Sequence, residues 1–135
     1  MNNDLRWKQQ FQDFEKALKV FQRRIDGYEK HSDEEAYQLA LVGAFELIHE
    51  LSYKTLKYYL ENEGVDADPS PKNVMRSAFQ NELISKAELW MESINKRSRI
   101  VLAYETNVLR EIIQFSTDDF YPIVRDLYFQ LKKEL

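Results

Sequence analysis

The chain has 135 residues, a net charge of −4 at pH 7 and no cysteine, which excludes disulfides, thiolate metal sites and a cysteine nucleophile. Its length fits one domain over residues 1–135, and 44% hydrophobic residues are enough to fill one core. Three glycines and three prolines leave little turn chemistry for short strands, and the negative charge gives no general attraction for nucleic acid.

Large apolar residues recur at heptad spacing near the N-terminus, which predicts a helix from about residue 4 to residue 30 with Asp4 as its cap. The seam consists of Trp7, Phe11, Phe14, Leu18, Phe21, Ile25 and Tyr28. A two-stranded coiled coil is the alternative, but rings of this size suit the core of a bundle better.

The second predicted helix begins at Ser32 or Asp33, runs to about Asn62 and ends near Gly64. Its apolar residues cover a wide arc, so we expect neighbouring helices on more than one side. The remaining polar strip carries Glu46, Glu50 and Lys54 at successive i+4 positions.

The segment GVDADPSP is the one clear break, and Ser70 followed by Pro71 predicts the cap and first residue of a short helix over 71–81. Ser85 is expected to open a fourth helix that continues through Tyr104.

A last helical stretch should run over 106–133, with a kink or break at Pro122. The sum is an all-α, antiparallel up-and-down bundle of four main helices plus a short one. No apolar leader and no run of 18 apolar residues are present, so we expect a cytoplasmic protein that does not bind membranes.

The stretch Glu46–His49 has the Glu-x-x-His spacing of di-iron bundles, but such a site needs two of these motifs, and His31 and His49 are the only histidines. No cofactor or metal is therefore expected within one chain; a metal site shared across a dimer is the alternative. Glu46 and Glu50 could form an acid–base pair, although pairing with Lys54 or with a partner's cations fits their spacing better.

Three cations are concentrated in NKRSR: Lys96, Arg97 and Arg99. Arg97 and Arg99 project about 200° apart on a helix, whereas Arg97 and Tyr104 share one face if the helix is continuous. The cluster is either an exposed basic turn or a binding site for an anion or a partner's carboxylate, which suits the bidentate fork of arginine.

Four blocks, RWKQQFQDFEKAL, FELIHELSYKTLKYYLENEG, SPKNVMRSAFQNELI and ELWMESINKRS, together resemble the nucleotidyltransferase substrate-binding proteins of the HEPN superfamily. The resemblance implies a helical bundle that forms a homodimer and binds a minimal nucleotidyltransferase, sometimes as a toxin–antitoxin pair. The family's second-helix pattern falls on Glu46, Glu50, Tyr53 and Lys54, with Tyr53 where Trp is usual.

Some HEPN relatives are metal-independent ribonucleases whose motif resembles Arg97, a polar residue at Ser98, a His five residues after the Arg, and Tyr104. Leu102 occupies the His position, and leucine cannot transfer a proton. The resemblance therefore implies a non-catalytic binding subunit, with a nucleotide or RNA as a candidate ligand. This interpretation requires that neither His31 nor His49 lies beside the Arg97 guanidinium.

Two alternatives stay open. One is an active ribonuclease that uses Arg97 for phosphate and Tyr104 or Glu105 as a base. The other is a dimer without ligand, in which Arg97 and Arg99 neutralise Glu46 or Glu50. Aromatic residues expected at the surface would serve a partner interface: Tyr53, Tyr58, Trp90 and Tyr121.

Overall fold

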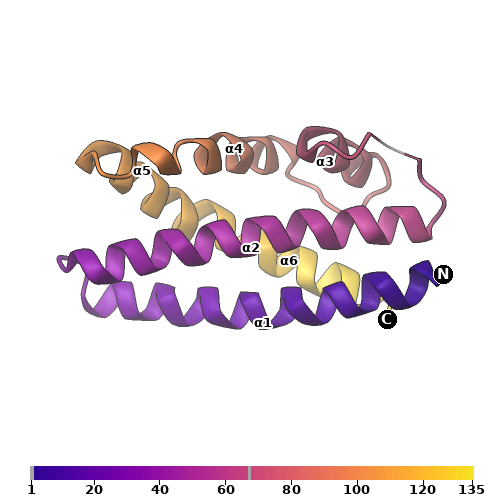
Figure 1. Cartoon of the computed structure of the whole chain (residues 1–135), viewed down its shortest axis with the longest axis horizontal. Coiled ribbons are helices and arrows are strands. Elements are labelled where there is room, and N and C mark those ends of the chain that lie inside the picture. The colour runs from indigo at the N-terminus through magenta and orange to yellow at the C-terminus, as the bar shows by residue number, and fades with distance from the viewer. Residues whose placement is uncertain (1, 67) are drawn as a thin grey trace.

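The chain forms a bundle of helices in which the main helices run alternately up and down (Figure 1). The computed structural model describes residues 2–66 and 68–135, and this part of the chain contains helices and turns but no strand. The helices are α1 (Asn3–Lys30), α2 (Glu35–Asn62), α3 (Pro71–Gln80), α4 (Ala87–Ser98), α5 (Thr106–Phe115) and α6 (Tyr121–Lys132). With α5 and α6 forming one interrupted helix, the predicted fold of four main helices plus a short one is confirmed.

The heptad seam of α1 faces the core, where its aromatic rings pack against α2 and α6 rather than against one partner helix. Its buried members are Trp7, Phe11, Phe14, Leu18 and Phe21. The predicted cap is wrong by two residues, because the Oδ1 of Asn2 accepts hydrogen bonds from the backbone N–H groups of Asp4 at 3.0 Å and Leu5 at 3.4 Å.

α2 contacts α1, α3, α4 and α5, as its wide apolar arc predicts. It begins at Glu35 with Glu34 at the N-cap, so neither Ser32 nor Asp33 caps it. It ends close to the predicted position: Gly64 adopts φ 77°, and the N–H of Val65 reaches back to the carbonyl of Leu60 at 2.9 Å. This is the closing hydrogen bond of a Schellman motif, which favours glycine at the left-handed position.

The prediction for α3 is confirmed at its start, because the Oγ of Ser70 accepts a hydrogen bond from the N–H of Asn73 at 3.4 Å and Pro71 is the first helical residue. The end of α3 repeats the motif that closes α2. Here the left-handed residue is Glu82, at φ 61°, and the N–H of Leu83 donates to the carbonyl of Ala78 at 2.9 Å.

The continuous fourth helix predicted from Ser85 through Tyr104 is wrong. α4 has Lys86 at its N-cap and ends at Ser98, and a short 3-10 turn over Ile100–Leu102 follows. The hydroxyl of Ser98 donates to the carbonyl of Asn95 at 2.7 Å, a local bond that competes with continuation of the helix.

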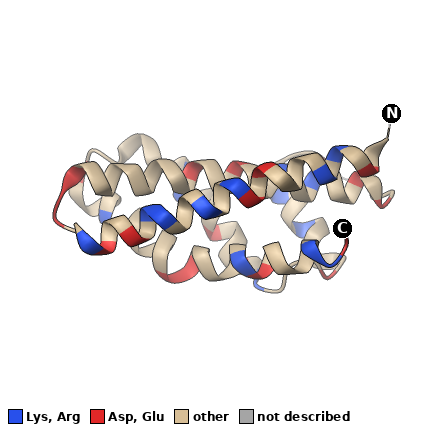
Figure 2. Cartoon of the chain, turned by 90° about the horizontal axis from the view of Figure 1, so that it is seen from below, with Lys and Arg blue, Asp and Glu red and all other residues tan. Residues whose placement is uncertain are grey.

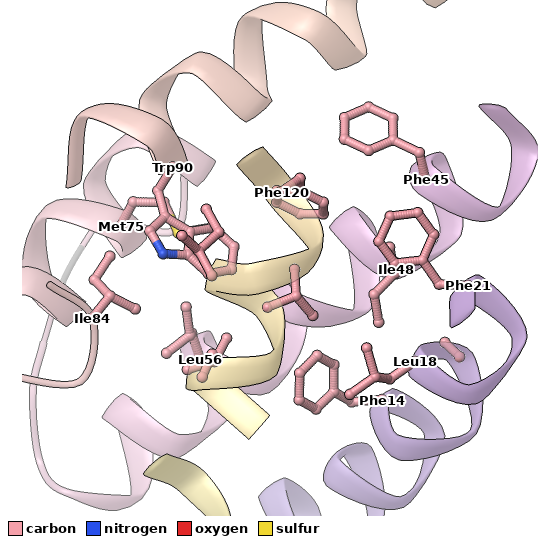
Figure 3. Packing of buried hydrophobic residues seen from close by; sticks show 14 of the residues in the cluster. Phe14, Leu18, Phe21, Phe45, Ile48, Leu56, Met75, Ile84, Trp90 and Phe120 are labelled. Carbon is pink, nitrogen blue, oxygen red and sulfur yellow. The ribbon is translucent and has the colours of Figure 1, made fainter. Parts of the chain in front are cut away.

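The break expected at Pro122 lies immediately before it, as a π-helical turn over Ser116–Phe120. The turn places Phe120 in the centre of the core, with ring centroids 5.1 Å from Phe45 and 5.4 Å from Trp90 (Figure 3). A π turn absorbs one extra residue in the helix, and α6 can then begin with proline among its first residues, where a missing N–H costs little.

The predicted surface aromatics are less exposed than expected. Trp90 is 1% exposed and belongs to the core, while Tyr53, Tyr58 and Tyr121 are partly buried against it. The solvent side of α1 is covered instead by charged residues of both signs (Figure 2). None of the described helices is long and apolar enough to cross a membrane.

Candidate functional site

Arg97, in the last turn of α4, forms an ion pair with α2. Its Nη1 lies 2.6 Å from Oε1 of Glu50, and the other carboxylate oxygen of Glu50 lies 3.5 Å from Nζ of Lys54. Arg97 and Glu50 are each about one-third exposed, so the pair is open to solvent on one side. The sequence prediction that Arg97, Glu50 and Lys54 share a site is consistent with this geometry.

His49 lies directly behind this ion pair. Its Nδ1 is 3.4 Å from Nη1 of Arg97, and its Nε2 is 3.0 Å from Oγ of Ser93, the residue one turn before Arg97 on α4. The expectation that no imidazole approaches the Arg97 guanidinium is therefore wrong. The histidine missing from position 102 has a counterpart on a different helix, and its protonation state decides what the site can do.

The hydrogen bonds around His49 determine its tautomer. The hydroxyl of Ser93 donates its only proton to the backbone carbonyl of Trp90 at 2.5 Å, so toward His49 it can act only as an acceptor. Nε2 of His49 must then carry the proton, and the lone pair of Nδ1 faces the guanidinium. His49 accepts a hydrogen bond from Arg97 and is not poised to take a proton from a substrate.

Burial and charge keep this imidazole neutral. Burial of the ring, followed by the nearby Arg97 cation, lowers the pKa of His49 to about 4, although Glu50 acts in the opposite direction. Burial alone would raise the pKa of the Glu50 carboxyl, but its bonds to Arg97 and Lys54 outweigh this and hold that pKa below its usual value. At pH 7 the cluster therefore holds two cations, one carboxylate and a neutral ring.

The chemistry available to this arrangement is anion binding. His49 and Glu50 both accept from Nη1 of Arg97 and orient its guanidinium, and no hydrogen bond to a described residue engages the other N–H groups. With Lys54 nearby, the cluster carries one net positive charge. A single phosphate or carboxylate group matches that charge.

Other predicted site residues do not join the cluster. Arg99 pairs with Glu111 on α5 at 3.7 Å, and Tyr104 lies on the turn after α4 with 79% of its surface exposed. Glu46 is exposed one turn before Glu50, and the structure shows no ion pair for it among the described residues. The interruption after Ser98 accounts for Tyr104, because it ends the continuous helix that would have placed Tyr104 on the face of Arg97.

Tyr53 is held differently again, since its hydroxyl donates a hydrogen bond to the backbone carbonyl of Pro69. Burial and the nearby Glu50 raise the pKa of Tyr53, so its phenol stays protonated. Tyr53 therefore fastens the loop before α3 to α2 beside the Glu50 carboxylate.

Sequence reasoning missed His49 and Ser93 as members of the site. The available signal was the position of His49 on the apolar side of α2, four residues after Phe45, where a buried ring needs polar partners. Ser93 and Arg97 are four residues apart on α4 and meet that ring together.

Comparison with known proteins covers most of the chain. A profile of the family described as "Nucleotidyltransferase substrate binding protein like" matches residues 9–133. A crystal structure of the Thermus thermophilus protein ttk003001694 has a similar fold, with a TM-score of 0.76, 26% sequence identity, and coverage of 88% of this chain and 98% of that one. Comparison with curated proteins finds no match. The family match includes every residue of the Arg97 cluster.

Proposed function

Because the chain belongs to the nucleotidyltransferase substrate binding protein like family, we propose that it is a binding subunit that docks on a minimal nucleotidyltransferase and helps present that enzyme's substrate. The observation that carries this proposal is the Arg97 guanidinium, which two acceptors orient while one side remains open to solvent. Such a group recognises a phosphate of the substrate or a carboxylate of the partner through paired, charge-assisted hydrogen bonds.

The oligomeric state, the location and the toxin–antitoxin pairing that we propose come from the sequence resemblance. We propose that the protein is a HEPN-like homodimer in the cytoplasm, and that with its nucleotidyltransferase it works as a toxin–antitoxin pair. Light scattering after gel filtration should give a mass of twice 16.2 kDa for the isolated protein. A mass of 16.2 kDa at micromolar concentration would contradict the homodimer but would leave the docking proposal standing.

Co-expression with a minimal nucleotidyltransferase tests the docking directly. The two proteins should elute together in gel filtration at micromolar concentration, and Arg97→Ala should weaken the complex about 10- to 100-fold, as expected when a charged hydrogen-bond donor is removed. Arg110→Ala, at an exposed position of α5, is the matched control and should leave the affinity unchanged. Separate elution of the two wild-type proteins would refute the proposal.

A metal-independent ribonuclease is the second candidate, and the position of His49 beside Arg97 favours it. Against it, the ring is 1% exposed, both of its nitrogens are engaged, and its pKa of about 4 leaves no acid for the leaving group at neutral pH. We therefore propose binding without turnover. Incubation of the purified protein with RNA in chelator decides the matter: cleavage that disappears in both Arg97→Ala and His49→Gln would establish the nuclease.

A further inference from the structure

A second concave site lies away from the Arg97 cluster, where the connection between α3 and α4 runs along α6. The cavity has a volume of about 610 Å³, within the range of small-molecule sites. Its floor is apolar and consists of side chains that are each less than a tenth exposed: Leu83, Ile84, Trp90, Ile123 and Leu127. A floor of this kind accommodates the flat or aliphatic body of a ligand.

Trp90 adds one polar group to this floor. The ring is 1% exposed, and no hydrogen bond joins its indole N–H to any described residue. Among the described residues, however, no side-chain nitrogen or oxygen that is sealed from solvent lacks a partner. The indole N–H therefore keeps some access to solvent, and its ring lines the cavity. Figure 3 shows the nitrogen on the side of the ring toward Met75 and Ile84, and Ile84 also lines the cavity. The indole N–H is therefore a hydrogen-bond donor without a protein acceptor among the described residues.

The rim of the cavity carries charge, and its charge is negative on balance. Glu82 and Asp126 face one cation, Lys86, and no ion pair joins any two of the three. Glu82 holds the left-handed conformation that glycine would adopt more easily, as Gly64 does at the end of α2. The end of α3 would form more easily with glycine at position 82, so helix termination does not explain why glutamate is there. A carboxylate at the rim that contacts a ligand would explain it.

Together these groups suit a ligand that has an acceptor directed at the floor and an amino donor directed at the rim. We propose that the cavity binds an amino-bearing heteroaromatic ring of the nucleobase class, such as the ring of adenosine or cytidine. The ring nitrogen accepts from the Trp90 indole, and the exocyclic amino group donates to Glu82 or Asp126. Phe79, which is 48% exposed at the rim, provides a face for stacking. The site is separate from the Arg97 cluster and does not depend on the function proposed for it.

The two tryptophans of the chain make the test direct, because Trp7 lies in the core between α1 and α2 and outside this cavity. In ¹H–¹⁵N spectra each indole gives one signal, which Trp7→Phe assigns. Adenosine and cytidine should move the Trp90 signal with saturation at millimolar concentration and leave the Trp7 signal in place. Uridine, which lacks the amino group, should bind at least threefold more weakly.

Variants at the rim separate recognition from folding. Glu82→Gln keeps the size of the side chain and should weaken adenosine binding at least threefold, while Glu88→Gln, on α4 outside the cavity, should change nothing. Ser85→Trp, at an exposed lining position, should block binding and leave the rest of the spectrum intact. A Trp90 signal that does not move with 10 mM adenosine or cytidine, or that moves equally with uridine, would overturn the proposal.

Discussion

His49 lies on the buried side of α2, where its two ring nitrogens have opposite roles toward Ser93 and Arg97. A neutral imidazole with a fixed tautomer offers one donor and one acceptor, as an amide side chain at this position would. Its contribution is to orient Arg97 without adding charge to the cluster. The same residue type can thus be a proton carrier on an exposed surface and a structural acceptor in a core.

The lowered pKa of His49 predicts how stability depends on pH. The unfolded chain takes up a proton near pH 6.5, whereas the folded protein resists protonation until about pH 4, so stability is fully present above pH 6.5 and is lost as the pH falls toward 4. The loss should reach roughly 3 kcal/mol. Urea unfolding at pH 7, 5.5 and 4.5 measures it.

His49→Gln is the control for this effect, because an amide keeps one donor and one acceptor but does not titrate in this range. The variant should lose most of the pH dependence between 4.5 and 6.5. Glu50, whose pKa is held below the usual 4.5, loses its own contribution mainly below that pH, so the comparison between pH 7 and 5.5 isolates His49. An unchanged pH profile in His49→Gln would show that another group is responsible.

Glu82 and Gly64 hold equivalent places at the ends of α3 and α2, and they predict opposite effects of substitution. Glu82→Gly should stabilise the protein by about 1 kcal/mol, because glycine adopts the left-handed conformation without strain. Gly64→Ala should destabilise it by about the same amount through strain alone, since an added Cβ would meet nothing within 4 Å. The urea midpoint should rise for Glu82→Gly and fall for Gly64→Ala. Midpoints that shift in the same direction would contradict the assignment of strain to Glu82.

At the scale of helices, the contact between α2 and α4 depends on the Arg97–Glu50 pair. A double-mutant cycle to alanine should give a coupling energy of about 1–2 kcal/mol, more than most exposed pairs, because the two groups are two-thirds buried and the geometry is short. The matched control is the more exposed Lys8–Asp4 pair within α1, at 3.0 Å, which should give about 0.3–0.5 kcal/mol. Coupling at Arg97–Glu50 no larger than that of the control would mean that the pair does not bind the helices together.

The π turn between α5 and α6 predicts where the core is most sensitive. Phe120 is fully buried among four phenylalanine and tryptophan rings, so Phe120→Ala should cost about 3–5 kcal/mol. Phe129→Ala, at a mostly exposed position of α6, should change stability by less than about 0.5 kcal/mol. Thermal unfolding compares the two, and similar losses would show that the turn does not organise the core.

Local signals in the sequence were enough to predict most helices. The heptad seam of α1 and the pair Ser70–Pro71 encode their structures through nearest neighbours, and both predictions are confirmed. The interruption after Ser98 was missed because isoleucine, valine and leucine continue an apolar pattern whether the backbone is α-helical or not. A hydroxyl bonded to the carbonyl three residues earlier decides the outcome there, and sequence spacing does not reveal it.

At the scale of the whole molecule, the candidate site depends on a contact between residues 48 positions apart. The spacing of Glu50 and Lys54 could be predicted along one helix, but the approach of His49 to Arg97 follows from how α4 packs on α2. Because α4 ends at Ser98 and a 3-10 turn follows, Arg97 falls in the last turn of the helix and Tyr104 lies beyond it, mostly exposed. Interhelical placement of this kind is where sequence reasoning failed.

Ser93 has a consequence that reaches beyond its own helix turn. A chain of hydrogen bonds links the Arg97 guanidinium, His49, the Ser93 hydroxyl and the backbone carbonyl of Trp90. The ring of Trp90 lines the cavity. Thermodynamic reciprocity then applies: if occupation of the cavity changes the anion affinity of Arg97 by some factor, the anion must change the affinity of the cavity by the same factor. Equal affinities of the cavity with and without the anion would show that the two ends of α4 bind independently.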